Sequence, residues 1–409
     1  MRKHRLLYLF LVLTSVAVLS TSNAVSSANL PRDSSQVILG VEQTAAYLPL
    51  LQGKRVALAI NNTSQLNGKS TLDTLLALGV KIVKGFGPEH GFRGSASAGA
   101  TVKDDIDEKT GIPLVSLYGK KYKPTKKDMQ GIDVLIFDMQ DVGTRFYTYL
   151  STLHYLMEAC AENQIELLIL DRPNPNDAYV DGPILKKGFE SFVGLHPIPI
   201  THGLTFGEYA GMINGEGWLP KGLTCKLTVI KLQHYHHGKP YVLPIPPSPN
   251  LNTQHAIYLY PSTCLFEGTA ISEGRGTMNP FAVIGSPALK NKYTFSFTPQ
   301  VIPGMVDKPK YLGQICYGLD LRKYDTQLFI DSGRINLSWL KELYAAYPDK
   351  AHFFRQSFSL LAGTDQLEKQ IREGKSVAEI RSSWEPALSN YKKTRAKYLL
   401  YPDYPKVSH

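Results

Sequence analysis

Residues 133–175 read "DVLIFDMQDVGTRFYTYLSTLHYLMEACAENQIELLILDRPNP". The stretch opens with an apolar run of strand length and continues with an amphipathic helical pattern over 149–164. It then returns to an apolar run that begins at residue 165 and ends in prolines. Nearly continuous apolar strands around a helix are typical of a parallel sheet that helices cover on both faces. The stretch therefore predicts a strand–helix–strand unit of an α/β protein.

The same alternation extends in both directions along the chain. One helix is predicted over 70–79, where Ser70 is a start signal and Gly79 a stop, and another over 205–216. Further strands are predicted at 55–60, 80–86, 112–119 and 223–232. We expect a Rossmann-like, doubly wound parallel sheet, of which the strand at 223–232 is the last member.

The length of 409 residues favours two domains or one large one. A Pro- and His-rich segment, "HYHHGKPYVLPIPPSPNLNTQ" at 234–254, follows the last predicted strand, and mixed strands and helices come after it. We place the domain boundary within this segment. The prediction is a Rossmann-like domain at 37–235 and a smaller α+β C-terminal domain at 236–409.

The N-terminus has the pattern of a secretory signal peptide, predicted at 1–28. Three basic residues precede an apolar run and then small residues, with plausible cleavage after Ala24 or Ala28. A single-span anchor is the alternative, although the apolar run is short for a bilayer. We expect a secreted or periplasmic protein without a membrane span after cleavage.

The charge pattern argues against a nucleic-acid partner. The net charge is +10, but the lysines are scattered except for a run at 119–128, which is more typical of a solvated loop. An anionic polymer of the cell envelope is a more natural partner for an exported protein. The four cysteines show no CxxC spacing, and we predict buried free thiols.

Several motifs that would indicate a cofactor or metal are missing from the sequence. No GxGxxG follows the first predicted strand, which disfavours a dinucleotide despite the fold, and no GxSxG elbow is present. His234, His236 and His237 form a cluster, but no carboxylate or cysteine lies nearby at ligand spacing. We predict a surface loop there, with no metal and no cofactor. A metal-dependent amidase or esterase at this cluster is a weaker alternative.

Polar residues gather where this fold builds its sites, at the carboxyl ends of the strands. "GPEHGFRG" at 87–94 places Glu89 and His90 directly after a predicted strand. "DMQDVGTRFYTY" at 138–149 also ends a predicted strand and holds two acids and an arginine. Further along the chain, "CLFEGTAISEGRGTMNPF" at 264–281 carries two more acids and an arginine among glycines. Paired carboxylates suit glycosidic bond cleavage, in which one gives a proton and another acts as base or nucleophile. For each acid alone, capping of the next helix is the alternative explanation.

Together, several stretches resemble the exo-β-N-acetylmuramidases of glycoside hydrolase family 171. They are "GPEHGFRG", "FDMQDVGTRFYTY", "LDRPNP", "HGLTFGEYA", "PPSPNL", "YPSTCLFEGT" and "SEGRGT". The resemblance spans residue 37 to the C-terminus. It implies a secreted hydrolase that releases N-acetylmuramic acid from the non-reducing ends of peptidoglycan fragments. It also implies an active site on the Rossmann-like domain and a C-terminal domain that contributes to the cleft.

On this basis Glu89 is the predicted general acid/base, and His90 would orient or tune it. Glu273 is the first choice for a second acid, with Asp141 and Glu267 in reserve. The predicted substrate-binding residues are Arg93, Asp138, Arg145, Tyr147, Tyr149, Asn174, His202, Glu267 and Arg275.

The two tyrosines are candidates for stacking on sugar rings. Arg145 and Arg275 are candidates for binding the lactyl carboxylate that distinguishes muramic acid from glucosamine. A non-catalytic cell-wall glycan-binding protein is the alternative function. The sequence leaves retaining, inverting and substrate-assisted mechanisms open.

Overall fold

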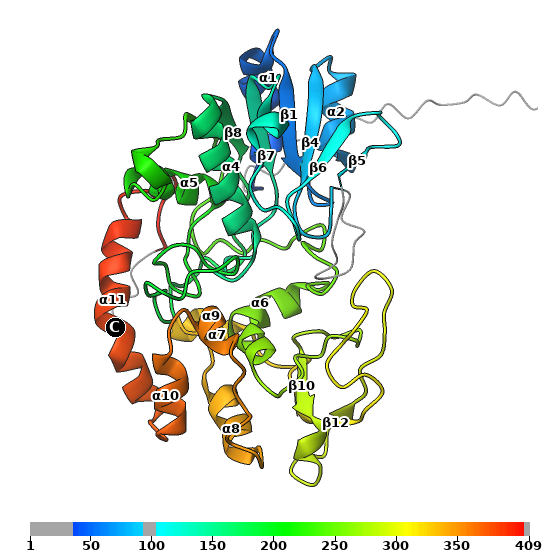
Figure 1. Cartoon of the computed structure of the whole chain (residues 1–409). Helices are drawn as coiled ribbons and strands as arrows, with labels where there is room; N and C mark the ends of the chain where they lie inside the picture. The colour runs from blue at the N-terminus through cyan, green and yellow to red at the C-terminus, as the bar shows by residue number, and fades with distance from the viewer. Residues whose placement is uncertain (1–35, 93–103, 405–409) are drawn as a thin grey trace, which may run out of the picture. The chain divides into compact units, whose positions relative to one another are not determined.

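A seven-stranded sheet organises the first half of the chain in the computed structural model, which describes residues 36–92 and 104–404. The strand order is β5-β6-β4-β1-β7-β8-β9 (Figure 1). The strands are β1 (Val56–Ile60), β4 (Ile82–Gly87), β5 (Asp105–Ile106), β6 (Pro113–Ser116), β7 (Val134–Asp138), β8 (Glu166–Leu170) and β9 (Leu227–Ile230).

The topology of this sheet is that of a Rossmann fold. All neighbouring strands are parallel except β5 and β6. Counted along the chain, the parallel strands have the spatial order 3-2-1-4-5-6. The order reverses between β1 and β7, which pair in register from Val56 opposite Val134 to Ile60 opposite Asp138. The predicted fold class is confirmed, and the switch point lies where β1 and β7 end.

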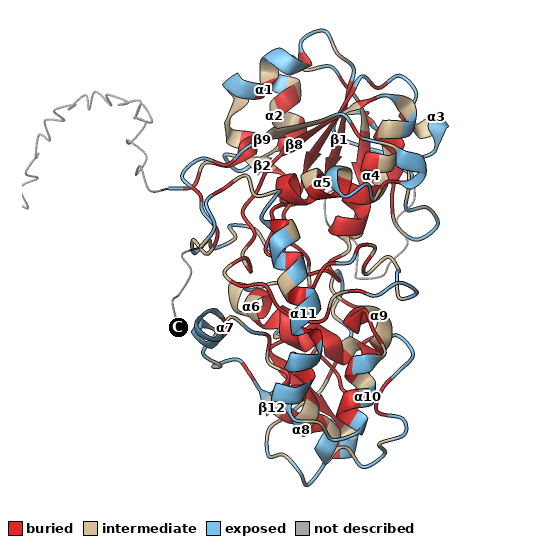
Figure 2. Cartoon of the chain, turned by 90° about the vertical axis from the view of Figure 1, so that its left-hand side faces the viewer, coloured by how far each residue is buried: buried red, intermediate tan, exposed pale blue. Residues whose placement is uncertain are grey.

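Helices cover both faces of the sheet, as the continuous apolar strands predict. Because side chains alternate along a strand, β1 sends Val56, Leu58 and Ile60 to one core and Ala57 and Ala59 to the other. The first core includes α1 (Thr44–Leu51) and α2 (Thr71–Ala77), and the second includes α4 (Tyr149–Asn163) and α5 (Phe206–Gly215). Figure 2 shows the strands buried between these layers.

Local signals account for the element ends. Ser70 begins α2, where its hydroxyl accepts a hydrogen bond from the Leu72 N–H, and Gly79 follows the helix with φ +79°. The strand predicted at 112–119 is shorter, because the chain leaves the sheet after Ser116. The shorter elements of this region are η1 (Gly40–Glu42), β2 (Gln65–Leu66), β3 (Lys69–Ser70), α3 (Lys126–Met129) and η2 (Pro220–Gly222).

The chain after residue 253 forms an α+β region around a three-stranded antiparallel sheet of order β10-β12-β11. Its strands are β10 (Val283–Ser286), β11 (Ser296–Phe297) and β12 (Cys316–Asp320). Its helices are α6 (Gln254–Thr263), η3 (Cys264–Gly268), η4 (Pro287–Leu289), α7 (Gln327–Ser332), α8 (Ser338–Ala346), α9 (Phe358–Ala362), α10 (Gln366–Arg372) and α11 (Val377–Arg395).

One hydrophobic core joins the two regions. It contains Phe206 of α5, Ile257 of α6 and Trp384 of α11. The end of the chain also returns to the large sheet, where the Tyr401 hydroxyl donates to Asp171 Oδ2 at 2.6 Å, directly after β8. The C-terminal region is therefore fastened to the edge of the sheet that carries the polar loops.

The buried thiols are confirmed, since all four cysteines are free and buried. The predicted signal peptide at 1–28 lies outside the described residues. Among the residues that the structure describes, no helix has the length and apolar content to cross a bilayer.

The histidine cluster differs from the predicted surface loop at His237. His234 and His236 are exposed, but His237 is fully buried. Its Nδ1 lies 2.7 Å from Asp177 Oδ2 and its Nε2 lies 3.0 Å from Glu208 Oε1. Both ring nitrogens are engaged by carboxylates distant in sequence, so neither is available to a metal ion in this arrangement.

We predict that His237 makes folding stability pH-dependent in the alkaline range. Burial opposes its charge, but the bonds to Asp177 and Glu208 prevail and raise the pKa of His237 to about 9. Because this folded value exceeds the unfolded one, the stabilisation is complete below roughly pH 6.5 and is lost as pH rises through about 9. Its size is on the order of 3 kcal/mol. Thermal unfolding followed against pH should show this loss, and His237→Gln should flatten the curve in that window.

Candidate active site

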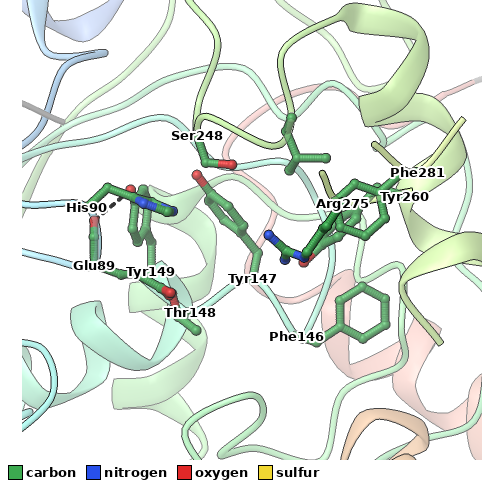
Figure 3. Close-up of a pocket in the computed structure, with 11 residues that line it drawn as sticks. Glu89, His90, Phe146, Tyr147, Thr148, Tyr149, Ser248, Tyr260, Arg275 and Phe281 are labelled. Atoms are coloured by element: carbon green, nitrogen blue, oxygen red, sulfur yellow. Dashed lines mark hydrogen bonds between the residues drawn. The ribbon is translucent and has the colours of Figure 1, made fainter. Parts of the chain in front are cut away.

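A pocket lies at the carboxyl edge of the large sheet and takes residues from both regions of the chain (Figure 3). Glu89 and His90 come from the loop after β4, the residues at 146–148 come from the loop after β7, and Tyr149 is the first residue of α4. The pocket is lined by Glu89, His90, Phe146, Tyr147, Thr148, Tyr149, Ser248, Leu251, Tyr260, Arg275 and Phe281.

A tight turn presents Glu89 directly after β4. The Gly91 N–H donates to the Pro88 carbonyl at 2.9 Å, and His90 adopts the left-handed region with φ +71°. A Cβ atom on Gly87 would lie 2.8 Å from the backbone nitrogen of Phe92, so only glycine permits this close return of the chain. Gly87 and Gly91 thus fix the position of the acid.

Glu89 is half-buried, and a neighbouring loop holds its carboxyl group. The Thr148 hydroxyl donates to Glu89 Oε2 at 2.9 Å. Burial, together with the Glu89 carboxylate, raises the pKa of the Tyr118 phenol above its ordinary value. The Tyr149 hydroxyl donates to the Glu89 carbonyl at 3.2 Å and accepts from Asn61 Nδ2 at 3.0 Å. Asn61 directly follows β1, so three adjacent strand ends converge on Glu89.

Tyr147 and Tyr149 form a rigid side of the pocket. Their ring centroids are 4.6 Å apart, and the Tyr147 hydroxyl donates to the Pro247 carbonyl at 3.0 Å. Burial raises the pKa of each phenol above its ordinary value, so both stay neutral. Both line the pocket as predicted, but Tyr149 is 1% exposed and its hydroxyl holds the Glu89 turn.

Arg275 brings a positive charge to the pocket from the C-terminal region. Its Nη2 donates to Glu267 Oε1 at 2.8 Å, and its Nε lies 3.4 Å from Glu273 Oε1. Lys310 Nζ donates to Glu273 Oε2 at 3.0 Å. The four groups form a network in which two cations neutralise two carboxylates.

Glu273, the first choice for a second acid, is buried within this network and outside the pocket lining. Burial disfavours its charge, but Lys310 and Arg275 outweigh that effect and hold the pKa of Glu273 below its ordinary value. Glu273 is therefore an ionised partner of two cations. Glu267 likewise pairs with Arg275, so both acids orient the arginine.

Asp141 and His202, also predicted at the site, form a buried pair behind it. Asp141 Oδ2 lies 3.2 Å from His202 Nε2, and Asp141 Oδ1 accepts from the Val142 N–H at 2.8 Å. His202 Nδ1 accepts from the Leu204 N–H at 3.2 Å. The structure does not bring either side chain into the lining of the pocket.

Asp138 and Asn174 serve the same sheet edge without lining the pocket. Asp138 accepts from Arg172 Nε and from the Thr71 hydroxyl, each at 2.6 Å, and is fully buried. Asn174 Nδ2 donates to the Leu204 carbonyl at 2.9 Å. Both side chains hold loops against the ends of the strands. This structural role accounts for their place in the polar motifs at the ends of β7 and β8.

Arg145 is placed differently from the predicted substrate contact. Its Nη1 donates to the carbonyls of Pro183 and Ile198, and its Nη2 donates to the carbonyl of Leu361, at 2.7–2.8 Å. The side chain is buried, and burial lowers the pKa of Arg145 to about 9. This placement does not support binding of the lactyl carboxylate by Arg145, because both terminal nitrogens are used by the main chain.

Six residues of the pocket lining were not among the predicted site residues: Phe146, Thr148, Ser248, Leu251, Tyr260 and Phe281. Thr148 lies between β7 and α4, so the strand-end rule that marked Glu89 applies to it as well. Ser248 lies within "PPSPNL", one of the quoted motifs. Arg93, in contrast, was predicted to bind substrate and lies outside the described residues.

Comparisons with known proteins match this architecture. The family described as "Exo-beta-N-acetylmuramidase NamZ, N-terminal" matches residues 56–255, and its C-terminal counterpart matches residues 258–401. The chain belongs to the exo-β-N-acetylmuramidase family. Membership makes the protein a glycoside hydrolase, which favours the enzyme over the non-catalytic glycan-binding alternative.

Individual proteins are similar to this one over nearly the full chain. The peptidoglycan β-N-acetylmuramidase NamZ of Bacillus subtilis (strain 168) is 40% identical, with 96% of this chain and 99% of that protein covered. A crystal structure of a DUF1343 family protein from Bacteroides fragilis NCTC 9343 is 48% identical, with a TM-score of 0.84 over 90% of this chain and 99% of that one. A second protein of that family and organism is 30% identical, with a TM-score of 0.76 over 89% and 99%.

We predict that Arg145 is needed for stability. In Arg145→Lys, one ammonium group cannot reach carbonyls on three separate segments, so buried acceptors lose their donors. The free energy of unfolding should fall by roughly 3 kcal/mol. Denaturant unfolding measures this change. An unchanged unfolding midpoint together with a raised KM would instead return Arg145 to substrate binding.

Proposed function

We propose that this protein is an exported exo-β-N-acetylmuramidase that removes N-acetylmuramic acid from the non-reducing ends of peptidoglycan fragments. The observation that carries the proposal is the convergence of Glu89, Tyr147 and Arg275 on one pocket at the carboxyl edge of the sheet. The family description and the name of the Bacillus subtilis relative support the exo mode and the substrate. The basic, apolar and small-residue pattern at 1–28 supports export.

In this proposal Glu89 is the general acid and base. Its protonated carboxyl gives a proton to the glycosidic oxygen as the bond from that oxygen to the anomeric carbon breaks, and the next sugar leaves as an alcohol. The carboxylate then takes a proton from the water whose oxygen joins the anomeric carbon. The Thr148 hydroxyl, 2.9 Å from Oε2, fixes the carboxyl group during both transfers. Such fixation matters because proton transfer requires hydrogen-bond distances.

Arg275 is proposed to recognise the lactyl carboxylate of muramic acid. Its interactions with Glu267 and Glu273 use Nη2 and Nε, and neither uses Nη1. Burial opposes its charge, but the two glutamates prevail and raise the pKa of Arg275, so the guanidinium stays charged. A charged donor with a fixed orientation suits a carboxylate ligand. The same glutamates would position Arg275, which gives Glu267 and Glu273 an indirect role.

The test of the general acid is Glu89→Gln. The amide cannot transfer a proton, so kcat for release of N-acetylmuramic acid from a muramic-acid disaccharide should fall roughly 10²–10⁴-fold. The matched control is Glu108→Gln, which changes an exposed carboxylate that does not line the pocket. Release can be followed by chromatography of the products. Activity of Glu89→Gln within a few-fold of the control would remove Glu89 from this role.

The test of carboxylate recognition is Arg275→Gln. Loss of a charge-assisted hydrogen bond should weaken binding of N-acetylmuramic acid about tenfold or more. Binding of N-acetylglucosamine, which has no lactyl group, should change little. Calorimetric titrations of both sugars measure the difference, with Arg55→Gln as a control at a surface ion pair. Equal losses for both sugars would show that the substitution only disturbs the pocket.

A further inference from the structure

Three aromatic side chains next to Glu89 form a cluster that the proposed catalytic residues do not use. They are Tyr118, Tyr122 and Phe192, hereafter the aromatic platform. Tyr122 and Phe192 stack with ring centroids 4.0 Å apart at 26°. Tyr118 packs edge-on against Tyr122 at 6.1 Å and lies 5.9 Å from Phe192. Tyr118 and Tyr122 come from the loop between β6 and α3, and Phe192 comes from the connection between β8 and α5, so the fold assembles the cluster.

The platform is held firmly in place. Tyr155 of α4 lies nearly parallel to Phe192, at 13° and 6.4 Å between centroids. Lys123, next to Tyr122, bridges Glu158 at 2.7 Å and Glu162 at 3.0 Å, both on α4. The lysine-rich stretch at 119–128 was predicted as a solvated loop, and these ion pairs anchor it to the helix that carries Thr148 at its start.

The platform nevertheless keeps apolar surface in contact with water. Tyr122 is 38% exposed, and it is the one aromatic among the exposed large hydrophobic side chains of the described residues. Since Phe192 covers one face of its ring, the exposed area belongs to the opposite face and the edges. An anchored and partly exposed aromatic ring suits a ligand with a flat apolar face.

The platform also begins beside the proposed general acid. β6 pairs with β4 with Ser116 opposite Gly87, and the Leu117 N–H donates to the Gly87 carbonyl at 2.8 Å, so Tyr118 leaves the sheet next to the turn that carries Glu89. The ring of Tyr118 packs in turn against Tyr122. A general acid contacts the oxygen between the two sugars, so one sugar lies on each side of Glu89. The terminal muramic acid belongs in the pocket with Arg275. The departing sugar then extends outward, toward the exposed Tyr122.

We propose that the aromatic platform binds the leaving sugar, the N-acetylglucosamine that follows the terminal muramic acid, by stacking Tyr122 on the apolar face of its ring. This inference rests on the function proposed above and adds a binding subsite to it. Tyr118 joins the subsite to the acid, and Phe192 supports Tyr122 from behind.

The test compares two substrates that share the same glycone. One is the disaccharide of N-acetylmuramic acid and N-acetylglucosamine, and the other is N-acetyl-β-muramyl fluoride, whose fluoride leaving group has no ring to stack. Tyr122→Ala should raise KM for the disaccharide roughly threefold to tenfold, the range of one aromatic stacking contact. KM for the fluoride should stay within twofold. Tyr122→Phe keeps the ring and should behave as wild type on both substrates.

Equal changes in KM for both substrates, or no change in KM for the disaccharide, would contradict the proposed subsite. Either result would leave the proposed function intact. A wild-type enzyme that cleaves neither substrate would overturn the proposed function instead. The platform is then judged by calorimetric titration of wild type and Tyr122→Ala with chitotriose, an oligomer of N-acetylglucosamine. Weaker binding by the variant alone supports the subsite, and equal binding or no binding by wild type rejects it.

Discussion

The pairing of β1 with both β4 and β7 is the constraint on which the site depends. Each pair is parallel, so the three strands end at the same edge of the sheet and their loops lie side by side. The hydroxyl of Tyr149 links the ends of these strands. It accepts a hydrogen bond from Asn61 after β1 and donates one to the Glu89 carbonyl after β4. A slip in register would separate these groups, because each hydrogen bond spans loops of different strands.

Much of the fold follows from the sequence because the large sheet is buried on both faces. Apolar runs such as "VLIFD" and the helix between β7 and β8 reveal a strand–helix–strand unit without long-range information. Glu89 and Tyr147 could also be placed near a site, because both follow strands that end at one edge of the sheet. Arg275 could be placed there because it stands with acids among glycines. The quoted family motifs identified the same positions independently.

What the sequence could not supply is which charged groups face the pocket and which face each other. Glu273 and Arg145 stand in equally suggestive motifs, yet one is enclosed by Lys310 and Arg275 and the other by main-chain carbonyls. His237 was expected on a surface loop because its partners, Asp177 and Glu208, are 60 and 29 residues away. A buried charged group requires a partner of opposite charge or a hydrogen bond. A local sequence pattern does not reveal a partner that lies tens of residues away in the chain.

The buried charges outside the pocket in turn explain how the pocket keeps its shape. Arg145 immediately precedes Phe146 and Tyr147, and its guanidinium fastens that loop to Pro183, Ile198 and Leu361. Since Leu361 belongs to α9, the loop that lines the pocket is tied directly to the C-terminal region that supplies Arg275. An arginine suits this position because a planar fork of donors can reach several fixed carbonyls at once. Arg145, which was expected to bind substrate, thus lies behind the pocket lining, where it fastens the two regions of the chain together.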